Sequence, residues 1–199
     1  MAQRTPGLGV DFGTSNTAAG YMWDERPRLI QFAPGQTTIP TTFFFDYDTR
    51  RMLIGEPANQ ALLEGAEGRF MRALKRVLGT SLMHERRQIL NEQVTFVDII
   101  ARFLTEVKAR AEADAGVIFD RVLSGRPVVF HGVGDPREAA AETDLRACYL
   151  AAGFHEVEFM PEPQAAAIAR GALEHQGSIG LIVDVGGGST DFSLFRSGR

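Results

Sequence analysis

The chain has 199 residues, of which 44% are hydrophobic and 23% are charged, and its formal net charge at pH 7 is −4. This composition excludes a disordered chain and is sufficient for one substantial core or two smaller ones. The negative balance supplies no broad basic surface, so neither nucleic acid nor a membrane is expected as a partner. The single cysteine, Cys148, cannot form an internal disulfide, and no segment has the roughly 18 apolar residues of a membrane-spanning helix. We therefore expect a cytoplasmic protein.

Short antiparallel strands are predicted in the first third of the chain, where apolar residues alternate and Gly, Asp and Pro mark the turns. The expected strands cover residues 8–12, 19–23, 29–32, 43–45 and 52–54. From residue 57 to about residue 78 the composition is helical, although Gly65 and Gly68 indicate a break in the middle.

Helices and strands alternate after residue 90, a pattern that favours an α/β layered domain. The expected helices cover residues 96–113, 136–152 and 162–173. The expected strands cover residues 121–123, 128–130 and 157–159, the first two being separated by Ser124-Gly125-Arg126-Pro127. His175-Gln176-Gly177 is the best linker candidate, because it follows a helix and precedes another apolar strand.

Two segments 173 positions apart (184 − 11) repeat one pattern, in which an apolar strand ends in an aspartate and is followed by a glycine turn and small hydroxyl residues. They read Asp11-Phe12-Gly13-Thr14-Ser15-Asn16 and Asp184-Val185-Gly186-Gly187-Gly188-Ser189. Glycine lets backbone N–H groups approach phosphate oxygens, and an aspartate can hold a hydrated magnesium ion beside them. We interpret the pair as two facing phosphate loops; an ordinary hairpin with a solvated aspartate is the alternative for either segment alone.

Three motifs in this order resemble the actin-like ATPase superfamily, and most closely the DnaK-type heat-shock chaperones. They are the segments at 9–17, 161–169 and 182–192, the middle one reading Pro161-Glu162-Pro163-Gln164-Ala165-Ala166-Ala167-Ile168-Ala169. Within that group, the segment at 124–130 and Asn16 are more similar to the YegD group of chaperone relatives than to DnaK itself. The resemblance covers essentially the whole chain.

The resemblance implies an α/β fold: an actin-like, ribonuclease H-like lobe with a mixed sheet flanked by helices, followed by the opening hairpin of a second lobe. The first lobe would cover residues 1–175, with a small inserted subdomain at about 46–92, and residues 176–199 would be the incomplete start of the second. Because such ATPase units are longer than this chain, we expect a truncated part of a larger protein.

The resemblance also implies that the parent protein binds and hydrolyses ATP with Mg²⁺, and that K⁺ is an associated monovalent cation. The implied catalytic residues are Glu162, Lys75 and Asp184. The implied phosphate contacts are Gly13, Thr14, Ser15, Asn16, Gly186, Gly187, Gly188 and Ser189, and the implied cation contacts are Asp11, Asp184 and Asp191. Glu162 would orient the attacking water and Lys75 would neutralise the transferred phosphate.

Each of these roles has a simpler alternative. Glu162 stands at the start of a helix, where an acid is favoured by the helix dipole alone. Lys75 lies in helical-looking sequence, where a lysine is usually a surface residue. Arg126 and Pro127 resemble the switch region that couples nucleotide to the partner domain, although Arg-Pro can also kink a strand.

Two classes of function therefore remain. The first is a chaperone-like ATPase that uses Mg-ATP to drive a conformational switch and binds unfolded client protein through regions outside this chain. These residues alone would be a weak or inactive catalyst, because half of the nucleotide clamp would be missing. The second is an actin-like scaffold that polymerises under nucleotide control. A sugar kinase is a third possibility, but no substrate aspartate is anchored by any motif.

Overall fold

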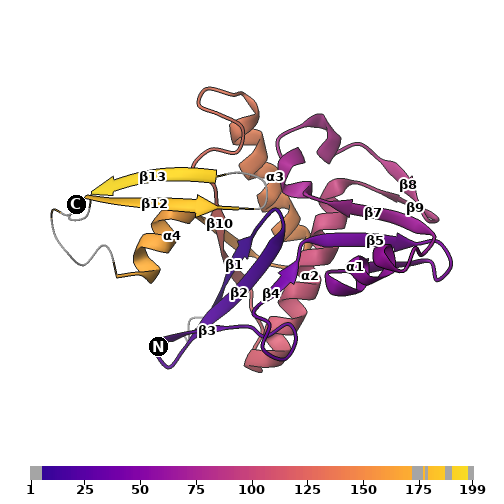
Figure 1. The fold of residues 1–199 in the computed structure, drawn as a ribbon, viewed down its shortest axis with the longest axis horizontal. Helices are drawn as coiled ribbons and strands as arrows, with labels where there is room; N and C mark the ends of the chain where they lie inside the picture. The colour runs from indigo at the N-terminus through magenta and orange to yellow at the C-terminus, as the bar shows by residue number, and fades with distance from the viewer. Residues whose placement is uncertain (1–5, 172–176, 178, 187–189, 197–199) are drawn as a thin grey trace.

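The computed structural model describes residues 6–171, 177, 179–186 and 190–196, and its largest element is a mixed six-stranded sheet (Figure 1). The strands run in the order β11 (Glu156–Pro161), β10 (Arg121–Arg126), β1 (Gly7–Phe12), β2 (Asn16–Trp23) and β3 (Arg26–Leu29), and β4 (Thr38–Pro40) also pairs with β2. β1 pairs with β10 in parallel and with β2 in antiparallel orientation. The mixed sheet and its flanking helices confirm the predicted α/β fold class.

The two faces of this sheet differ, because side chains alternate between them along each strand. In β1, Leu8, Val10 and Phe12 are buried on the face that carries the core, where Phe12 contacts the ring of Phe103 on α2 (Phe96–Ala115). The intervening residue Asp11 is exposed on the opposite face. The sheet therefore has one packed face and one face that remains partly open.

The packed face is covered by α2 and α3 (Arg137–Ala151), which also contact each other. The start of α2 is fixed by a capping box between Thr95 and Asp98, and its end by Gly116 in the left-handed conformation. Both helices were predicted within a few residues of their bounds: α2 from the period of its apolar positions, and α3 as the segment that begins at Pro136.

The residues between β4 and α2 form a second, smaller group of elements. It contains a three-stranded sheet, in the order β6 (Arg51–Ile54), β5 (Thr42–Asp46) and β7 (Gly68–Arg72), with α1 (Glu56–Leu63) against it. Two short 3₁₀ turns, η1 (Leu74–Val77) and η2 (Ser81–Met83), and the hairpin of β8 (Arg87–Ile89) and β9 (Glu92–Val94) complete it. The division of the chain into lobes and an inserted subdomain stays a prediction.

The expected helix over residues 57–78 is wrong beyond α1. The chain turns at Gly65, and the following residues pair with β5 as β7 before the 3₁₀ turn η1 begins. Helical composition is a weak preference, and the backbone pairing offered by the exposed edge of β5 outweighs it. The prediction located the break correctly but assigned the wrong structure after it.

The expected strand at 128–130 is also wrong, and the expected interruption at 124–127 is largely absent. β10 continues through Ser124 and Gly125 to Arg126, and pairs with β11 along its whole length. It ends before Pro127, which has no N–H to donate to a ladder. The N–H of Phe130 donates instead to the carboxylate of Glu138 on α3, at 2.8 and 2.9 Å.

The last described elements form a separate two-stranded sheet of β12 (Ile179–Val185) and β13 (Thr190–Arg196). β12 contacts α4 (Glu162–Ala169), the helix that directly follows β11 (Figure 1). Among the described residues, no helix is long and apolar enough to cross a membrane.

Candidate functional site

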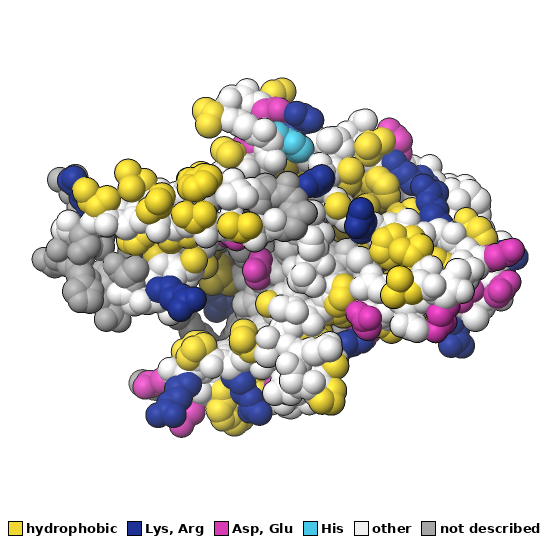
Figure 2. Space-filling model, in the orientation of Figure 1, with side chains coloured by type: hydrophobic (Ala, Val, Ile, Leu, Met, Phe, Trp, Pro, Cys, Tyr) yellow, Lys and Arg dark blue, Asp and Glu magenta, His cyan; other side chains and the backbone are white. Residues whose placement is uncertain are grey.

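A large cleft of about 1570 Å³ lies on the open face of the main sheet, between that face, α4, η1 and β12. The space-filling view shows the molecule hollowed in this region (Figure 2). The lining includes residues from both predicted phosphate loops and the two residues predicted to act on the γ-phosphate. The cleft therefore brings together segments from the beginning, middle and end of the chain.

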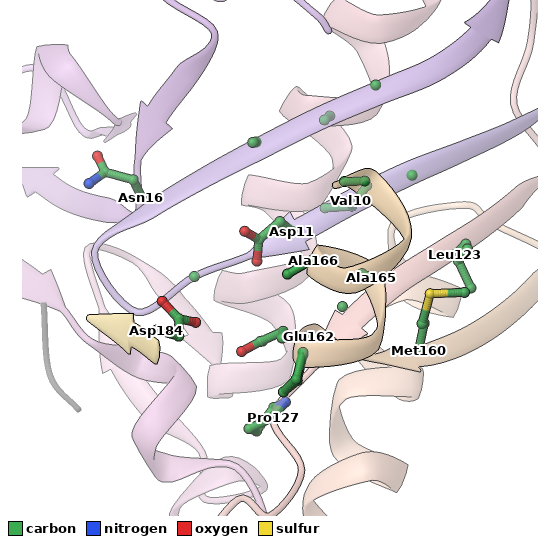
Figure 3. A pocket seen from close by; sticks show the side chains of 18 of the residues that line it. Val10, Asp11, Asn16, Leu123, Pro127, Met160, Glu162, Ala165, Ala166 and Asp184 are labelled. Carbon is green, nitrogen blue, oxygen red and sulfur yellow. The ribbon is translucent and has the colours of Figure 1, made fainter. Parts of the chain in front are cut away.

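Asp11 occupies the floor of the cleft at the carboxyl-terminal part of β1. Its carboxylate shares the cleft with Glu162 and Asp184, and Figure 3 shows the three side chains directed toward one space. Burial raises the pKa of the Asp11 carboxyl above its ordinary value, and the negative charges of Glu162 and Asp184 raise it further, while Lys75 opposes them. The local charge balance thus favours a cation.

Lys75 and Glu162 form an ion pair in which Nζ and Oε1 are 2.7 Å apart, although the residues are separated by 87 positions (162 − 75). Their side chains are 10% and 23% exposed. Lys75 lies on the 3₁₀ turn η1, and its side chain is largely buried against Glu162, so it is not the surface lysine of the alternative interpretation. Two residues selected for one reaction therefore meet in the folded chain.

Glu162 is the first residue of α4, and the backbone fixes its position closely. Pro161 precedes the helix, and Pro163 occupies its first turn, where the missing N–H costs nothing. Gly125 of β10 lies beneath: a Cβ there would stand 3.3 Å from Cγ of Glu162 and 3.7 Å from Oδ1 of Asp11. A side chain at position 125 would occupy the space between the two carboxylates.

The first loop, Gly13 to Asn16, lines the cleft, and its phosphate contacts stay a prediction. A Cβ on Gly13 would lie 2.2 Å from the backbone oxygen of Asn16, so no larger residue fits this turn. Thr41 holds the loop through two contacts. Its N–H donates to the Ser15 carbonyl at 2.8 Å, and its buried hydroxyl lies 2.9 Å from that of Thr17. Gly13, Thr14 and Ser15 are thus held at the cleft.

In the second segment, Asp184 on β12 and Gly186, which follows the end of β12, line the same cleft. Gly187, Gly188 and Ser189 lie outside the described residues, as does the side chain of Asp191, whose backbone pairs in register with Asp184. The predicted phosphate contacts of those three residues and the predicted cation contact of Asp191 therefore stay predictions.

The residues present fit a hydrated magnesium ion with a nucleotide better than a bare metal ion. In the described part of the chain, no three His, Cys, Asp or Glu side chains are close enough to hold one metal ion together. Asp11 and Asp184 nevertheless line the same cleft, and Gly125 leaves room beside Asp11. Mg²⁺ usually keeps several waters and is bound through one or two carboxylates and the substrate phosphates.

Sequence reasoning missed two buried contacts behind the cleft. The hydroxyl of Ser124, which directly precedes Gly125, lies 2.8 Å from the hydroxyl of Tyr149 on α3. Asp144 of α3 accepts a hydrogen bond from the N–H of Gly79. Asp144 shares the helical face of the buried residues Ala141, Leu145 and Cys148, and that spacing was the signal available in the sequence.

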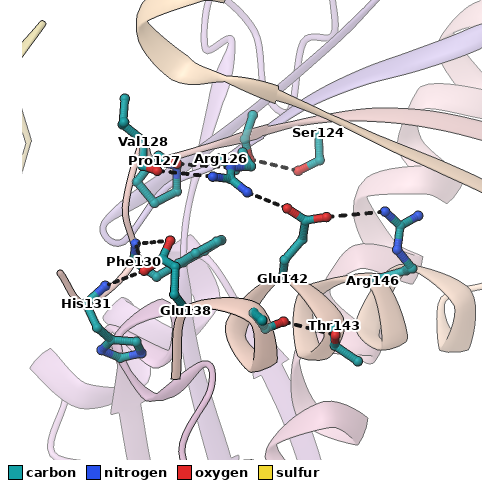
Figure 4. Close-up of polar contacts among 12 residues, drawn as sticks. Ser124, Arg126, Pro127, Val128, Phe130, His131, Glu138, Glu142, Thr143 and Arg146 are labelled. Atoms are coloured by element: carbon teal, nitrogen blue, oxygen red, sulfur yellow. Dashed lines mark hydrogen bonds and ion pairs between the residues drawn. The ribbon is translucent and has the colours of Figure 1, made fainter. Parts of the chain in front are cut away.

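Arg126 and Pro127 lie at the edge of the cleft, where β10 ends (Figure 4). Pro127 lines the cleft, whereas Arg126 forms an ion pair with Glu142 of α3 and donates to the carbonyl of Val128 at 3.1 Å. These contacts show that Arg126 connects the end of the strand to α3. The proposed switch role of the two residues stays a prediction.

Comparison with known proteins places this geometry in a family. The chain matches the family described as Hsp70 protein over residues 7–199. It is 30% identical over 203 residues to the chaperone protein DnaK of Methanothermobacter thermautotrophicus, a match that covers all of this chain and 32% of that protein. It is 31% identical over 194 residues to DnaK of Thermosipho africanus, covering 96% of this chain and 30% of the relative. DnaK of Ureaplasma parvum serovar 3 is 28% identical over 189 residues, covering 94% and 29%.

The chain therefore belongs to the Hsp70 family. It corresponds to part of a DnaK-type nucleotide-binding domain, and it spans about a third of the length of the DnaK proteins it matches. The predicted DnaK-type resemblance is confirmed, whereas the narrower similarity to the YegD group stays a prediction. The matches support the chaperone interpretation over the polymerising scaffold.

Proposed function

We propose that the protein binds Mg-ATP in this cleft and hydrolyses it to drive the conformational switch of an Hsp70-type chaperone. One observation carries the proposal: Asp11, Lys75, Glu162 and Asp184 come from four separate elements and face one cleft beside a glycine turn. Membership of the Hsp70 family supports it independently. Because the chain spans only part of its relatives, the activity belongs to the whole protein.

Glu162 is the residue best placed to orient the attacking water. Lys75 holds one carboxylate oxygen of Glu162, Oε1, at 2.7 Å, and the side chain remains accessible from the cleft. A carboxylate fixed in this way can align a water or accept its proton, and such positioning dominates phosphoryl transfer. The ammonium group of Lys75 can also face the transferred phosphate, where it stabilises developing negative charge.

The phosphate chain itself would lie along the first loop. Gly13, Thr14 and Ser15 offer backbone and hydroxyl donors at the cleft, and Asp11 and Asp184 would hold the waters around the metal. When bound, Mg²⁺ neutralises phosphate charge and polarises the phosphoryl group. An associated K⁺ near the same carboxylates is part of the proposal.

Partners and location follow from the family. We propose that unfolded client protein is bound by regions outside these residues, that the protein acts in the cytoplasm, and that neither nucleic acid nor a membrane takes part. The acidic net charge of the chain supports the last point, since it provides no broad basic surface.

The test is single-turnover hydrolysis of Mg-ATP by the full-length protein and its Glu162→Gln variant. We expect the variant to bind ATP with similar affinity and to lose about 100-fold in the chemical step, because the amide cannot accept the proton of the water. Glu158→Gln is the matched control: it makes the same change four residues earlier (162 − 4), on an exposed side chain paired with Arg121. Equal rates in all three proteins would contradict the role of Glu162, and a wild-type protein that neither binds nor hydrolyses ATP would contradict the function.

A further inference from the structure

Lys75 depends on a short loop for its position, and the structure shows how that loop is fixed. The 3₁₀ turn η1 follows Ala73, which adopts a left-handed conformation, and places Lys75 between the buried residues Leu74 and Leu78. A 3₁₀ turn of four residues has weaker hydrogen bonds than an α-helix and needs outside support. That support comes from α3, whose residues do not line the cleft.

Asp144 provides the main contact. Its carboxylate is 6% exposed, accepts the N–H of Gly79 at 2.7 Å through Oδ2, and lies 2.8 Å from Nε2 of His84 through Oδ1. Both carboxylate oxygens of Asp144 are thus used, one by Gly79 at the start of the loop and one by His84 at its end. A buried carboxylate is costly unless it is paired, so this arrangement locks the loop and the helix together.

Gly79 lets the loop approach α3 closely enough for this bond. Its φ is +79°, and a Cβ there would lie 2.4 Å from the carbonyl oxygen of Arg137. A second contact lies next to it, because Nε2 of His131 is 2.5 Å from the carbonyl oxygen of Leu78. The peptide group that joins Leu78 to Gly79 is therefore held at both its C=O, by His131, and its N–H, by Asp144.

We propose that Asp144 is a positioning residue, which fixes the loop 78–84 against α3 and thereby holds the ammonium group of Lys75 against Glu162 in the cleft. This inference rests on the proposed function, in which Lys75 faces the phosphates. Asp144 touches neither Lys75 nor the cleft, so its effect passes through Gly79 and the turn η1. Hydrogen bonds to a charged, buried acceptor are among the stronger ones, which suits this task.

The chain offers a direct test, because Lys75 and Lys108 are its only lysines. Acetylation of each lysine by an N-hydroxysuccinimide ester is followed by mass spectrometry on the full-length protein without nucleotide. Lys108 is a suitable reference, since its side chain is 14% exposed and paired with Glu112 on α2, away from the loop. Global unfolding would expose both lysines, whereas release of the loop would expose Lys75 alone.

In Asp144→Ala we expect Lys75 acetylation to rise about tenfold relative to Lys108, because the Gly79 N–H and His84 lose their partner. Asp144→Asn retains an oxygen that can accept from Gly79 and should restore most of the protection. Thr143→Ala, on the exposed side of the same helix, should change neither lysine. If Asp144→Ala does not fold, His84→Ala removes only the outer contact and should give a smaller rise of the same kind.

An unchanged ratio of Lys75 to Lys108 acetylation in Asp144→Ala would overturn the proposal, because burial of Leu74 and Leu78 alone would then fix the turn. Single-turnover hydrolysis supplies a second readout: Asp144→Ala should lower the chemical step and leave ATP affinity nearly unchanged, and it should cost nothing further in a Lys75→Ala background. An added loss in that background would contradict the pathway through Lys75. Absence of ATP turnover in the wild-type protein would count against the proposed function, while the acetylation result would still decide the role of Asp144.

Discussion

The two predicted phosphate loops share a sequence pattern, but the strands that lead into them differ in structural support. The first follows β1, whose residues Leu8, Val10 and Phe12 are buried in the main core, and Thr41 ties it from behind. The second joins the two strands of a separate hairpin, on which Leu181 and Phe192 remain 59% and 69% exposed. Figure 2 shows hydrophobic side chains spread over this hairpin. Two-stranded sheets are marginally stable by themselves, so the described packing supports β1 more firmly than it supports the strands of the hairpin.

The comparison indicates how the site is divided. Asp11, Lys75 and Glu162 are held by the main sheet, by α3 through the loop at 78–84, and by the start of α4. Asp184 reaches the same cleft from the hairpin, which contacts α4. The Lys75–Glu162 pair, Asp11 and the first loop thus form a preorganised half, to which the hairpin brings a third carboxylate, that of Asp184.

The largest expected effect comes from breaking the support of the first loop. Phe12→Ala removes a fully buried ring that packs on Phe103 and should lower the free energy of unfolding by about 3–5 kcal/mol. The matched change on the hairpin, Phe192→Ala, removes an exposed ring and should cost less than about 0.5 kcal/mol. Urea denaturation of the two variants measures both values. Similar losses would show that the two loops are equally supported.

A second prediction concerns the ion pair within the preorganised half. Lys75→Ala leaves Glu162 without its partner and removes a positive charge from the cleft, so we expect a loss of about 100-fold in single-turnover hydrolysis. Lys108→Ala is the matched control, because it also breaks a lysine–glutamate pair but lies on α2 outside the cleft. Equal rates for the two variants would remove Lys75 from the chemistry.

The smallest effect is expected from Asp11 in the absence of nucleotide. Its folded-state pKa is raised by burial and by Glu162 and Asp184, so its ionised form disfavours the folded state, and the stability it contributes at low pH is lost as the pH rises through the folded-state pKa. Asp11→Asn should therefore raise the free energy of unfolding at pH 7 by a few tenths of a kcal/mol. The value is small because Asp11 faces the open cleft, where solvent screens its charge even though the surrounding protein atoms partly desolvate it.

The gain in Asp11→Asn should disappear below the ordinary pKa of aspartate, where the wild-type carboxyl is protonated in both the folded and unfolded states. Urea midpoints measured across pH 3 to pH 8 test the trend. A gain that grows toward low pH would contradict the sign derived from the environment of Asp11.

The sequence predicted best where a local pattern determines both structure and chemistry. Asp11 and Gly13 follow a buried strand and a tight turn, and Glu162 opens a helix between two prolines, so their placement could be expected from neighbouring residues alone. Helix α2 was equally predictable, because its apolar residues recur at three- and four-residue steps along its length.

Prediction failed where a distant segment decided the outcome. β7 forms because the edge of β5 is available to it. The chain leaves the main sheet after β10 because Pro127 ends the ladder and Glu138 accepts the N–H groups of Phe130 and His131. The function of Asp144 depends on Gly79, which lies 65 positions away (144 − 79). Composition and apolar periodicity describe one segment and do not identify the segment it contacts, so these pairings could not be predicted from the sequence.

The central claim is that Lys75 and Glu162 act together on ATP in the cleft, and a double-mutant cycle tests it most directly. Single-turnover hydrolysis of Mg-ATP would be measured for the full-length protein, for Lys75→Ala, for Glu162→Gln and for the double variant. The account predicts that the double variant loses about as much as the worse single variant, because the two residues serve one step. Losses that multiply would show that the residues act independently, and unchanged rates in all the variants would contradict the site itself.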